Sequence, residues 1–101
     1  MYIAMNRFPI AAGRENDFIE VWRTRDSKLD EVPGFIEFHL LQGPEIEGGR
    51  VFISHSRWES YAHFHAWTES DAFKQAHGGK SRAPEGTYLG PPRFEGFEVA
   101  L

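Results

Sequence analysis

Two β-rich runs lie close together in the middle of this chain, and they limit the possible folds more than any other feature. The runs are "FIEFHLLQG" (35–43) and "RVFISHSRW" (50–58), both rich in β-branched and aromatic residues. The segment between them, "GPEIEGG" (43–49), has the proline and glycines of a hairpin loop. The sequence therefore predicts an antiparallel hairpin in the centre of the domain.

The segments before the hairpin predict one strand and one helix. "YIAMNRF" (2–8) has strand composition, and Pro9 with the following "AAGREN" is expected to end it. Apolar positions then recur at three- and four-residue steps, which predicts a helix from Glu15 to about Val32. "VPGF" should stop that helix, because the residue before a proline is disfavoured in helical conformation.

The segments after the hairpin predict two short helices, a loop and a last strand. Ser60 and Ser70 occupy N-cap positions before "YAHFHAW" and "DAFKQAH". "GGKSRAPEGTYLGPP" (78–92) is rich in glycine and proline, so we expect a mobile loop there. "RFEGFEVAL" (93–101) is expected to close the chain as a strand.

The resulting order, β-α-β-β-α-β, predicts one α+β domain over residues 1–101 with the ferredoxin-like, split βαβ arrangement. A four-stranded antiparallel sheet with its helices on one face leaves the other face uncovered. A second copy of the same sheet is the simplest cover. The aromatic content of 15% is consistent with surface reserved for a second subunit or a flat ligand.

Composition excludes several classes of function. The formal charge is −4 and the eleven Lys and Arg are scattered, so nucleic acid is not an expected partner. The absence of cysteine excludes disulfides, thiolate metal sites and thiol nucleophiles. No run of eighteen apolar residues occurs, and the first ten residues do not form a signal-peptide core, so we expect a cytoplasmic protein without membrane attachment.

Four residues could carry chemistry, and each also has an ordinary structural interpretation. His77 either interacts with the carbonyl end of a helix or is accessible as a ligand for a metal or cofactor. Phe64 and Trp67 lie one turn apart and form part of the core or the wall of a flat-ligand site. Asn6, unusual in a strand, lies at a solvent edge or directs its amide toward a bound molecule.

The spacing of the other histidines limits which of them could bind zinc together. His63 and His65 are two residues apart on a predicted helix, so they point in nearly opposite directions and cannot share an ion. His39 and His55 could meet across the hairpin on one face. Because the sequence alone places no carboxylate or thiolate beside them, the two imidazoles fall short of a convincing zinc site, and a structural zinc held by histidines alone stays an open alternative.

Several motifs together resemble one known family. "MNRF" (5–8), "VPGFIEFHLL" (32–41), "SRWES" (56–60) and "FHAWTESDAFKQAH" (64–77) resemble the IsdG-type heme-degrading monooxygenases of the antibiotic-biosynthesis-monooxygenase superfamily. The closing "YLGPPRFEGFEV" (88–99) is most similar to the HmuQ/HmuD branch of bacterial heme oxygenases. The combination of Asn6, Trp67 and His77 is the most specific part of the resemblance.

The resemblance implies a role for each candidate residue. His77 would be the proximal ligand of the heme iron, Asn6 the amide that hydrogen-bonds bound dioxygen, and Trp67 the side chain that pushes the porphyrin out of plane. Phe64 would line the apolar pocket. Arg25 would pair a heme propionate, although a solvated helix arginine whose stem covers the core explains it equally simply.

The implied activity is that of a heme-degrading monooxygenase, with heme as both substrate and cofactor. Dioxygen and an electron donor, a reductase or a chemical reductant, would open the ring to a biliverdin-like tetrapyrrole and release iron. The family also implies a homodimer whose sheets join as an α+β barrel. Two alternatives stay open: a non-enzymatic heme-binding protein, and a cofactor-independent monooxygenase of a polycyclic aromatic substrate.

Overall fold

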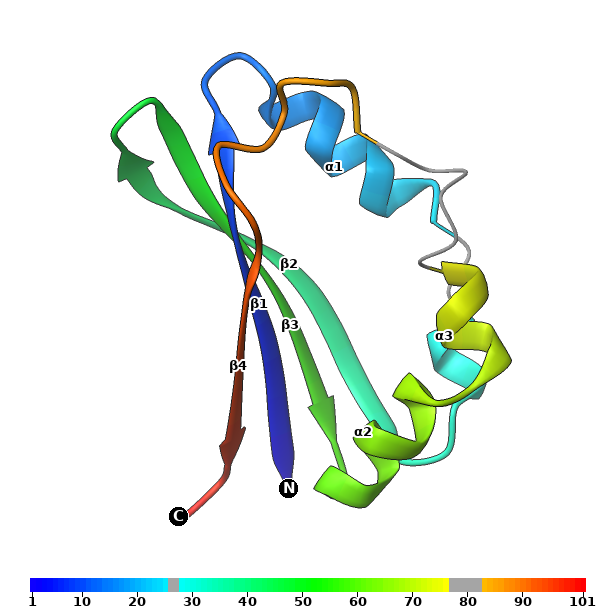
Figure 1. The fold of residues 1–101 in the computed structure, drawn as a ribbon. Coiled ribbons are helices and arrows are strands. Elements are labelled where there is room, and N and C mark those ends of the chain that lie inside the picture. The colour runs from blue at the N-terminus through cyan, green and yellow to red at the C-terminus, as the bar shows by residue number, and fades with distance from the viewer. Residues whose placement is uncertain (26–27, 77–82) are drawn as a thin grey trace.

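The computed structural model describes residues 1–25, 28–76 and 83–101. Its elements in chain order are β1 (Tyr2–Ala11), α1 (Glu15–Arg23), the 3-10 turn η1 (Leu29–Glu31), β2 (Phe35–Ile46), β3 (Gly49–Trp58), α2 (Tyr61–Thr68), α3 (Asp71–Ala76) and β4 (Arg93–Glu98). The strands form one sheet in the order β2-β3-β1-β4, with every neighbouring pair antiparallel. The helices lie on one side of this sheet (Figure 1), which confirms the predicted ferredoxin-like α+β class.

The first helix is shorter than the sequence pattern predicts. α1 ends at Arg23, and the Thr24 hydroxyl donates a hydrogen bond to the Glu20 carbonyl at 2.8 Å. Such a local side-chain bond offers the backbone an alternative to further helix. Lys28 has a positive φ of 53° and only the short turn η1 follows it, so the prediction of one helix up to Val32 is wrong.

The strands, by contrast, run longer than predicted at two places. β1 continues through Pro9 to Ala11, beyond the last residue that pairs with β4, Arg7. A proline is compatible with a strand where its missing N–H has no ladder partner. The hairpin loop predicted over 43–49 is mostly strand as well, because β2 reaches Ile46 and the turn is only Glu47–Gly48, with Gly48 at φ 84°.

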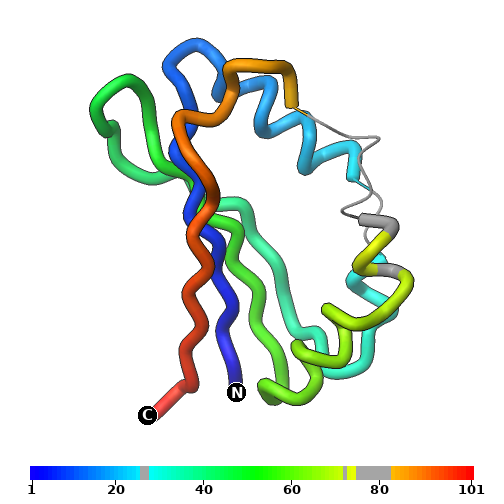
Figure 2. Tube along the Cα trace, in the orientation of Figure 1, coloured from blue at the N-terminus to red at the C-terminus, as the bar shows by residue number. Residues whose placement is uncertain are grey.

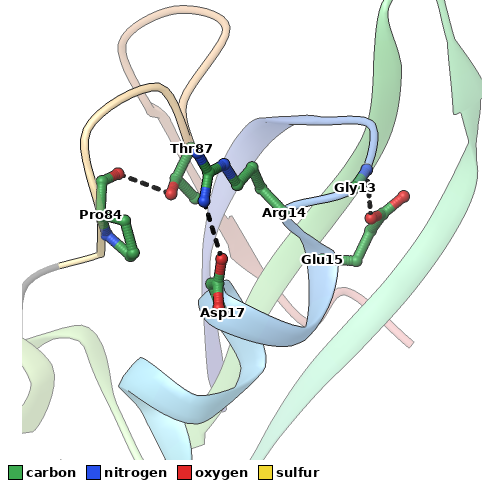
Figure 3. Close-up of polar contacts among 6 residues, drawn as sticks. All are labelled: Gly13, Arg14, Glu15, Asp17, Pro84 and Thr87. Carbon is green, nitrogen blue, oxygen red and sulfur yellow. Dashed lines mark hydrogen bonds and ion pairs between the residues drawn. The ribbon is translucent and has the colours of Figure 1, made fainter.

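The segment 83–92 is hydrogen-bonded to the C-terminal end of β1. The Ala11 N–H donates to the Thr87 carbonyl at 2.8 Å, and the Leu89 N–H donates to the Pro9 carbonyl at 2.8 Å. The buried Thr87 hydroxyl also donates to the Pro84 carbonyl, beside the start of α1 (Figure 3). Residues 78–82 of the predicted mobile loop lie outside the described residues, and the mobility of the loop stays a prediction.

Side chains interact with the N-terminus of α1, and β4 ends before the end of the chain. The Gly13 N–H donates to Glu15 Oε1 at 2.8 Å, and Arg14 pairs with Asp17 at 3.3 Å, so acidic groups lie at the positive end of α1 (Figure 3). The strand predicted to reach Leu101 ends at Glu98. The two chain ends lie at the end of the sheet opposite the β2–β3 turn (Figure 2).

Two buried clusters attach the helices to the sheet. One joins Ile10, Phe18 and Phe52 under α1, and the other joins Tyr2, Ala4 and Trp58 under α2. Full burial of a large apolar side chain contributes roughly 1.5–3 kcal/mol to the free energy of folding, so each cluster stabilises the packing of its helix on the sheet. The predicted N-caps are both present, because Ser60 Oγ accepts from the His63 N–H and Ser70 Oγ from the Phe73 N–H, each at 3.2 Å.

Within the described residues, no helix has the length and apolar character needed to cross a membrane.

Candidate functional site

A cavity of about 500 Å³ opens between the helices and the sheet. This volume lies within the range of small-molecule sites, roughly 300–1,000 Å³. Strands supply its floor, while the end of α1, the helices α2 and α3, and the segment before β4 supply its walls. The lining residues are Ala4, Asn6, Phe8, Trp22, Arg25, Leu29, Phe38, Ser54, Ser56, Phe64, Trp67, Thr68, Phe73, Tyr88, Pro92 and Phe94.

The floor of the cavity carries a short polar strip. Asn6 on β1 is directly opposite Ser54 on β3 and Phe94 on β4, and both neighbours also line the cavity. Ser54 is only 6% exposed. Since β1 is an inner strand, the interpretation of Asn6 as a solvent-edge residue is wrong, and its amide belongs to a site enclosed by aromatic side chains.

The walls are aromatic and closely supported. The rings of Phe64 and Phe94 are stacked at a centroid distance of 5.7 Å and an angle of 10°. Trp67 packs edge-on against Phe73 at 4.8 Å and lies 5.4 Å from Trp58. Phe64 and Trp67 therefore serve both as core and as cavity wall, and the two interpretations of their spacing are compatible.

Arg25 places a cation at the edge of this apolar space. It lies just beyond the end of α1 rather than on the helix, and its guanidinium is 4.1 Å from the centroid of the Trp22 ring. Its buried Nε has no hydrogen-bond partner among the described residues. Burial lowers the pKa of Arg25, and the phenol of Tyr88 acts in the opposite direction. An arginine nevertheless stays protonated, so the cavity presents a positive charge able to pair with an anion.

Tyr88 was not anticipated from the sequence as a site residue. Its ring lines the cavity 6.3 Å from that of Phe8, and burial raises its pKa, while Arg25 lowers it. The sequence does show Tyr88 as one aromatic residue within a glycine- and proline-rich segment. A single aromatic residue in a loop is too common to indicate a binding site. Phe94 was missed for a different reason, since the sequence of this six-residue strand does not show which of its two faces would lie toward the cavity.

The structure brings together Asn6, Arg25, Phe64 and Trp67, four of the five residues selected from the sequence. The fifth, His77, lies outside the described residues. It is the next residue in the chain after α3, whose Phe73 lines the cavity.

Residues 1–79 match the model of the antibiotic biosynthesis monooxygenase family. The chain belongs to this family. A heme-degrading monooxygenase of Shouchella clausii is 35% identical over 102 residues, which covers 100% of this chain and 92% of that protein. A staphylobilin-producing heme oxygenase of Staphylococcus saprophyticus is 33% identical over 84 residues, with 81% of this chain and 78% of the relative covered.

A solved structure extends the comparison within the family. The heme-degrader MhuD of Mycobacterium tuberculosis, with two hemes bound in its active site, aligns with a TM-score of 0.74 at 26% identity. The alignment covers 100% of this chain and 97% of that one. The ferredoxin-like fold of this family member is therefore the same as that of a heme-bound relative.

Proposed function

We propose that this chain is a heme-degrading monooxygenase that binds heme in the cavity and opens its ring with dioxygen. The observation that carries the proposal is an aromatic-walled cavity containing both an amide, Asn6, and a half-buried cation, Arg25. The similarity to proteins named heme-degrading monooxygenase over the full length of the chain supports it.

The cavity residues suit the two chemically different parts of heme. The stacked Phe64 and Phe94 and the ring of Trp67 offer flat apolar surface to a macrocycle at little entropic cost. The Nε atom of Arg25 has no hydrogen-bond partner among the described residues. The guanidinium would therefore form a charge-assisted hydrogen bond with a propionate carboxylate. A purely apolar polycyclic substrate would leave this cation unpaired, which favours heme over that alternative.

Three further residues would have separate roles in binding heme and activating dioxygen. His77 would supply the neutral nitrogen ligand, and heme, when bound, supplies an iron that activates dioxygen. Asn6 would donate a hydrogen bond from its amide to a molecule bound in the cavity, without being a source of protons. Trp58 and Phe73 pack against Trp67, so its indole would press as a rigid wall on a bound macrocycle.

The finer parts of the function are also proposals. We expect a biliverdin-like open tetrapyrrole, release of iron, and electrons from a reductase or a chemical reductant. We expect a cytoplasmic homodimer in which the uncovered faces of two sheets meet as a barrel. Exposed apolar residues on that face, including Leu41 and Phe97, would be buried by the second sheet.

The first experiment is an absorbance titration of the purified protein with hemin, followed by ascorbate in air with catalase present. A saturable Soret band that decays while chelatable iron appears would support a degrading enzyme. A band that survives the reductant would indicate a heme-binding protein without activity. Absence of saturable binding would contradict the proposal and favour the cofactor-independent alternative.

Two substitutions separate binding from turnover. His77→Ala should abolish the Soret shift, whereas Asn6→Ala should keep the shift and lower the decay rate by at least tenfold. His65→Ala is a suitable control, because this exposed histidine on α2 does not line the cavity. Mass spectrometry of the extracted pigment distinguishes a biliverdin-like product from staphylobilin, and light scattering gives the oligomeric state.

A further inference from the structure

Tyr88 and Arg25 reach the cavity from segments that are far apart in the sequence. Arg25 follows the end of α1, Tyr88 lies in the segment that leads into β4, and both side chains line the cavity. We propose that Tyr88 is a second propionate-binding residue, whose phenol donates a hydrogen bond to the carboxylate that Arg25 pairs with. This two-point contact fixes the rotation of the macrocycle in the cavity. The inference rests on the proposed heme function.

The backbone of Tyr88 is held on the sheet. It forms an antiparallel bridge with Ile10 of β1. On each side of this bridge, a backbone hydrogen bond of 2.8 Å joins the same segment to β1. Because side chains alternate in direction along an extended segment, this attachment fixes the side from which Tyr88 projects. Its position is therefore set by the fold as well as by its own rotamer.

The ring of Tyr88 is packed on the helix side of the sheet. Its centroid lies 5.8 Å from that of Phe18 on α1, edge to face at 86°, and 6.3 Å from that of Phe8 on β1. This is the side that contains the cavity, opposite the face that a second sheet would cover. A tyrosine packed through its ring usually directs its hydroxyl to a polar partner.

The phenol of Tyr88 and the guanidinium of Arg25 lie close enough to interact. Burial raises the pKa of Tyr88, and Arg25 lowers it by a smaller amount, so the phenol stays protonated at neutral pH and can donate a hydrogen bond. The buried Nε of Arg25 has no hydrogen-bond partner among the described residues. One oxygen of a carboxylate can accept from the guanidinium and the other from the phenol, and both hydrogen bonds are charge-assisted.

Two donors at one end of the cavity would orient a bound heme. Ile10, opposite Tyr88, is four residues from Asn6 on β1, which is roughly 13 Å along the strand at about 3.3 Å per residue. The anion-binding end is therefore well separated from the amide, as the propionate edge of a heme is from its centre. A single cation lets the macrocycle swivel about the carboxylate, whereas two donors on different segments define its rotation. That rotation decides which meso carbon lies toward Asn6.

The test compares Tyr88→Phe with the wild type, because this change removes the hydroxyl and keeps the ring. Soret titration with hemin should show about tenfold weaker binding by the variant. Hemin dimethyl ester, whose propionates carry no negative charge, should bind equally well to both proteins. Proton NMR of the cyanide complex of the ferric heme should show one predominant set of heme methyl resonances in the wild type. Tyr88→Phe should show additional sets from other rotations.

Tyr61→Phe is the matched control, because Tyr61 is an exposed tyrosine of α2 that does not line the cavity. It should match the wild type in hemin affinity and in its NMR spectrum. Wild-type hemin affinity or a single set of heme methyl resonances in Tyr88→Phe would overturn the proposal and leave the heme function in place. Equal weakening of hemin and its dimethyl ester would also overturn it, because the hydroxyl would then act on packing. Absence of saturable hemin binding by the wild type would overturn both.

Discussion

The two faces of the sheet are built from the same strands, yet they differ in chemistry. On the cavity face, Asn6, Ser54 and Phe94 lie together beneath aromatic rings. On the open face, which carries no helices, the residues one step along each strand form ion pairs and a cluster of one glutamate and two histidines. Because successive side chains alternate between faces, one strand can serve both an apolar pocket and a charged surface. The difference shows that a residue's role here depends on its face more than on its strand.

The largest effect should come from the core beneath the cavity. Trp58 is fully buried, packs on Phe64 and Trp67, and donates its indole N–H to Ser56 Oγ at 2.9 Å. Trp58→Ala should lower the free energy of unfolding by about 3–5 kcal/mol, measured by urea denaturation. Leu41→Ala on the open face should cost less, about 2 kcal/mol, because the homodimer proposed above covers this leucine with a second sheet. A loss of about 1 kcal/mol or less would mean that the open face is exposed in solution and would contradict the dimer.

A more selective comparison uses two phenylalanines of β4. Phe94 faces the cavity and is 52% exposed, whereas Phe97 pairs opposite Ile3 on the other face and is 45% exposed. Phe94→Ala should weaken hemin binding about twofold to twelvefold, because one aromatic contact contributes roughly 0.5–1.5 kcal/mol. Phe97→Ala should leave the affinity measured by Soret titration unchanged. Equal effects of the two changes would place the heme elsewhere.

A smaller effect is expected from the cap of α2, the helix that carries Phe64 and Trp67. Ser60 Oγ accepts a hydrogen bond from the His63 N–H, so Ser60→Ala should lower the free energy of unfolding by about 1 kcal/mol. Thermal and urea unfolding measure the change. Ser60→Asp should restore the stability, and Glu59→Ala, next to the cap, should have little effect. If Ser60→Asp were as unstable as Ser60→Ala, the capping role would be wrong.

The smallest effect should come from an ion pair between β1 and the edge strand β4. Arg7 Nε and Glu95 Oε1 are 3.2 Å apart, with side chains 46% and 44% exposed. A double-mutant cycle of Arg7→Gln and Glu95→Gln should give a coupling of roughly 0.2–1 kcal/mol that decreases in high salt. A coupling well above this range and insensitive to salt would indicate that the pair is desolvated.

The sequence predicted the elements better than their ends. The two serine caps were correct because capping depends on a few neighbouring residues. The end of α1 was wrong because the apolar spacing continued through Leu29 and Val32, which instead pack against the cluster around Trp58 from a separate turn. Pro9 was misread for a similar reason, since whether a proline interrupts a strand depends on which neighbour would need its N–H.

The candidate site was predictable only in part. Asn6, Arg25, Phe64 and Trp67 were selected from local oddity and family resemblance, and all four line one cavity. Tyr88 and Phe94 join them because a long connection returns the chain to β1, and no local pattern encodes that contact. The placement of Glu37 beside His39 and His55 was likewise invisible until the register of the hairpin was known.

The sequence by itself determined the order of strands and helices, the helix caps and the alternation of side chains along each strand. These features arise from interactions among residues a few positions apart. Only the tertiary structure decided that Asn6 lies in an inner strand, that the aromatic rings enclose a cavity containing Arg25, and that a carboxylate joins the two histidines. Each of these depends on strand pairing and helix packing between distant segments, where burial across the whole domain selects the arrangement.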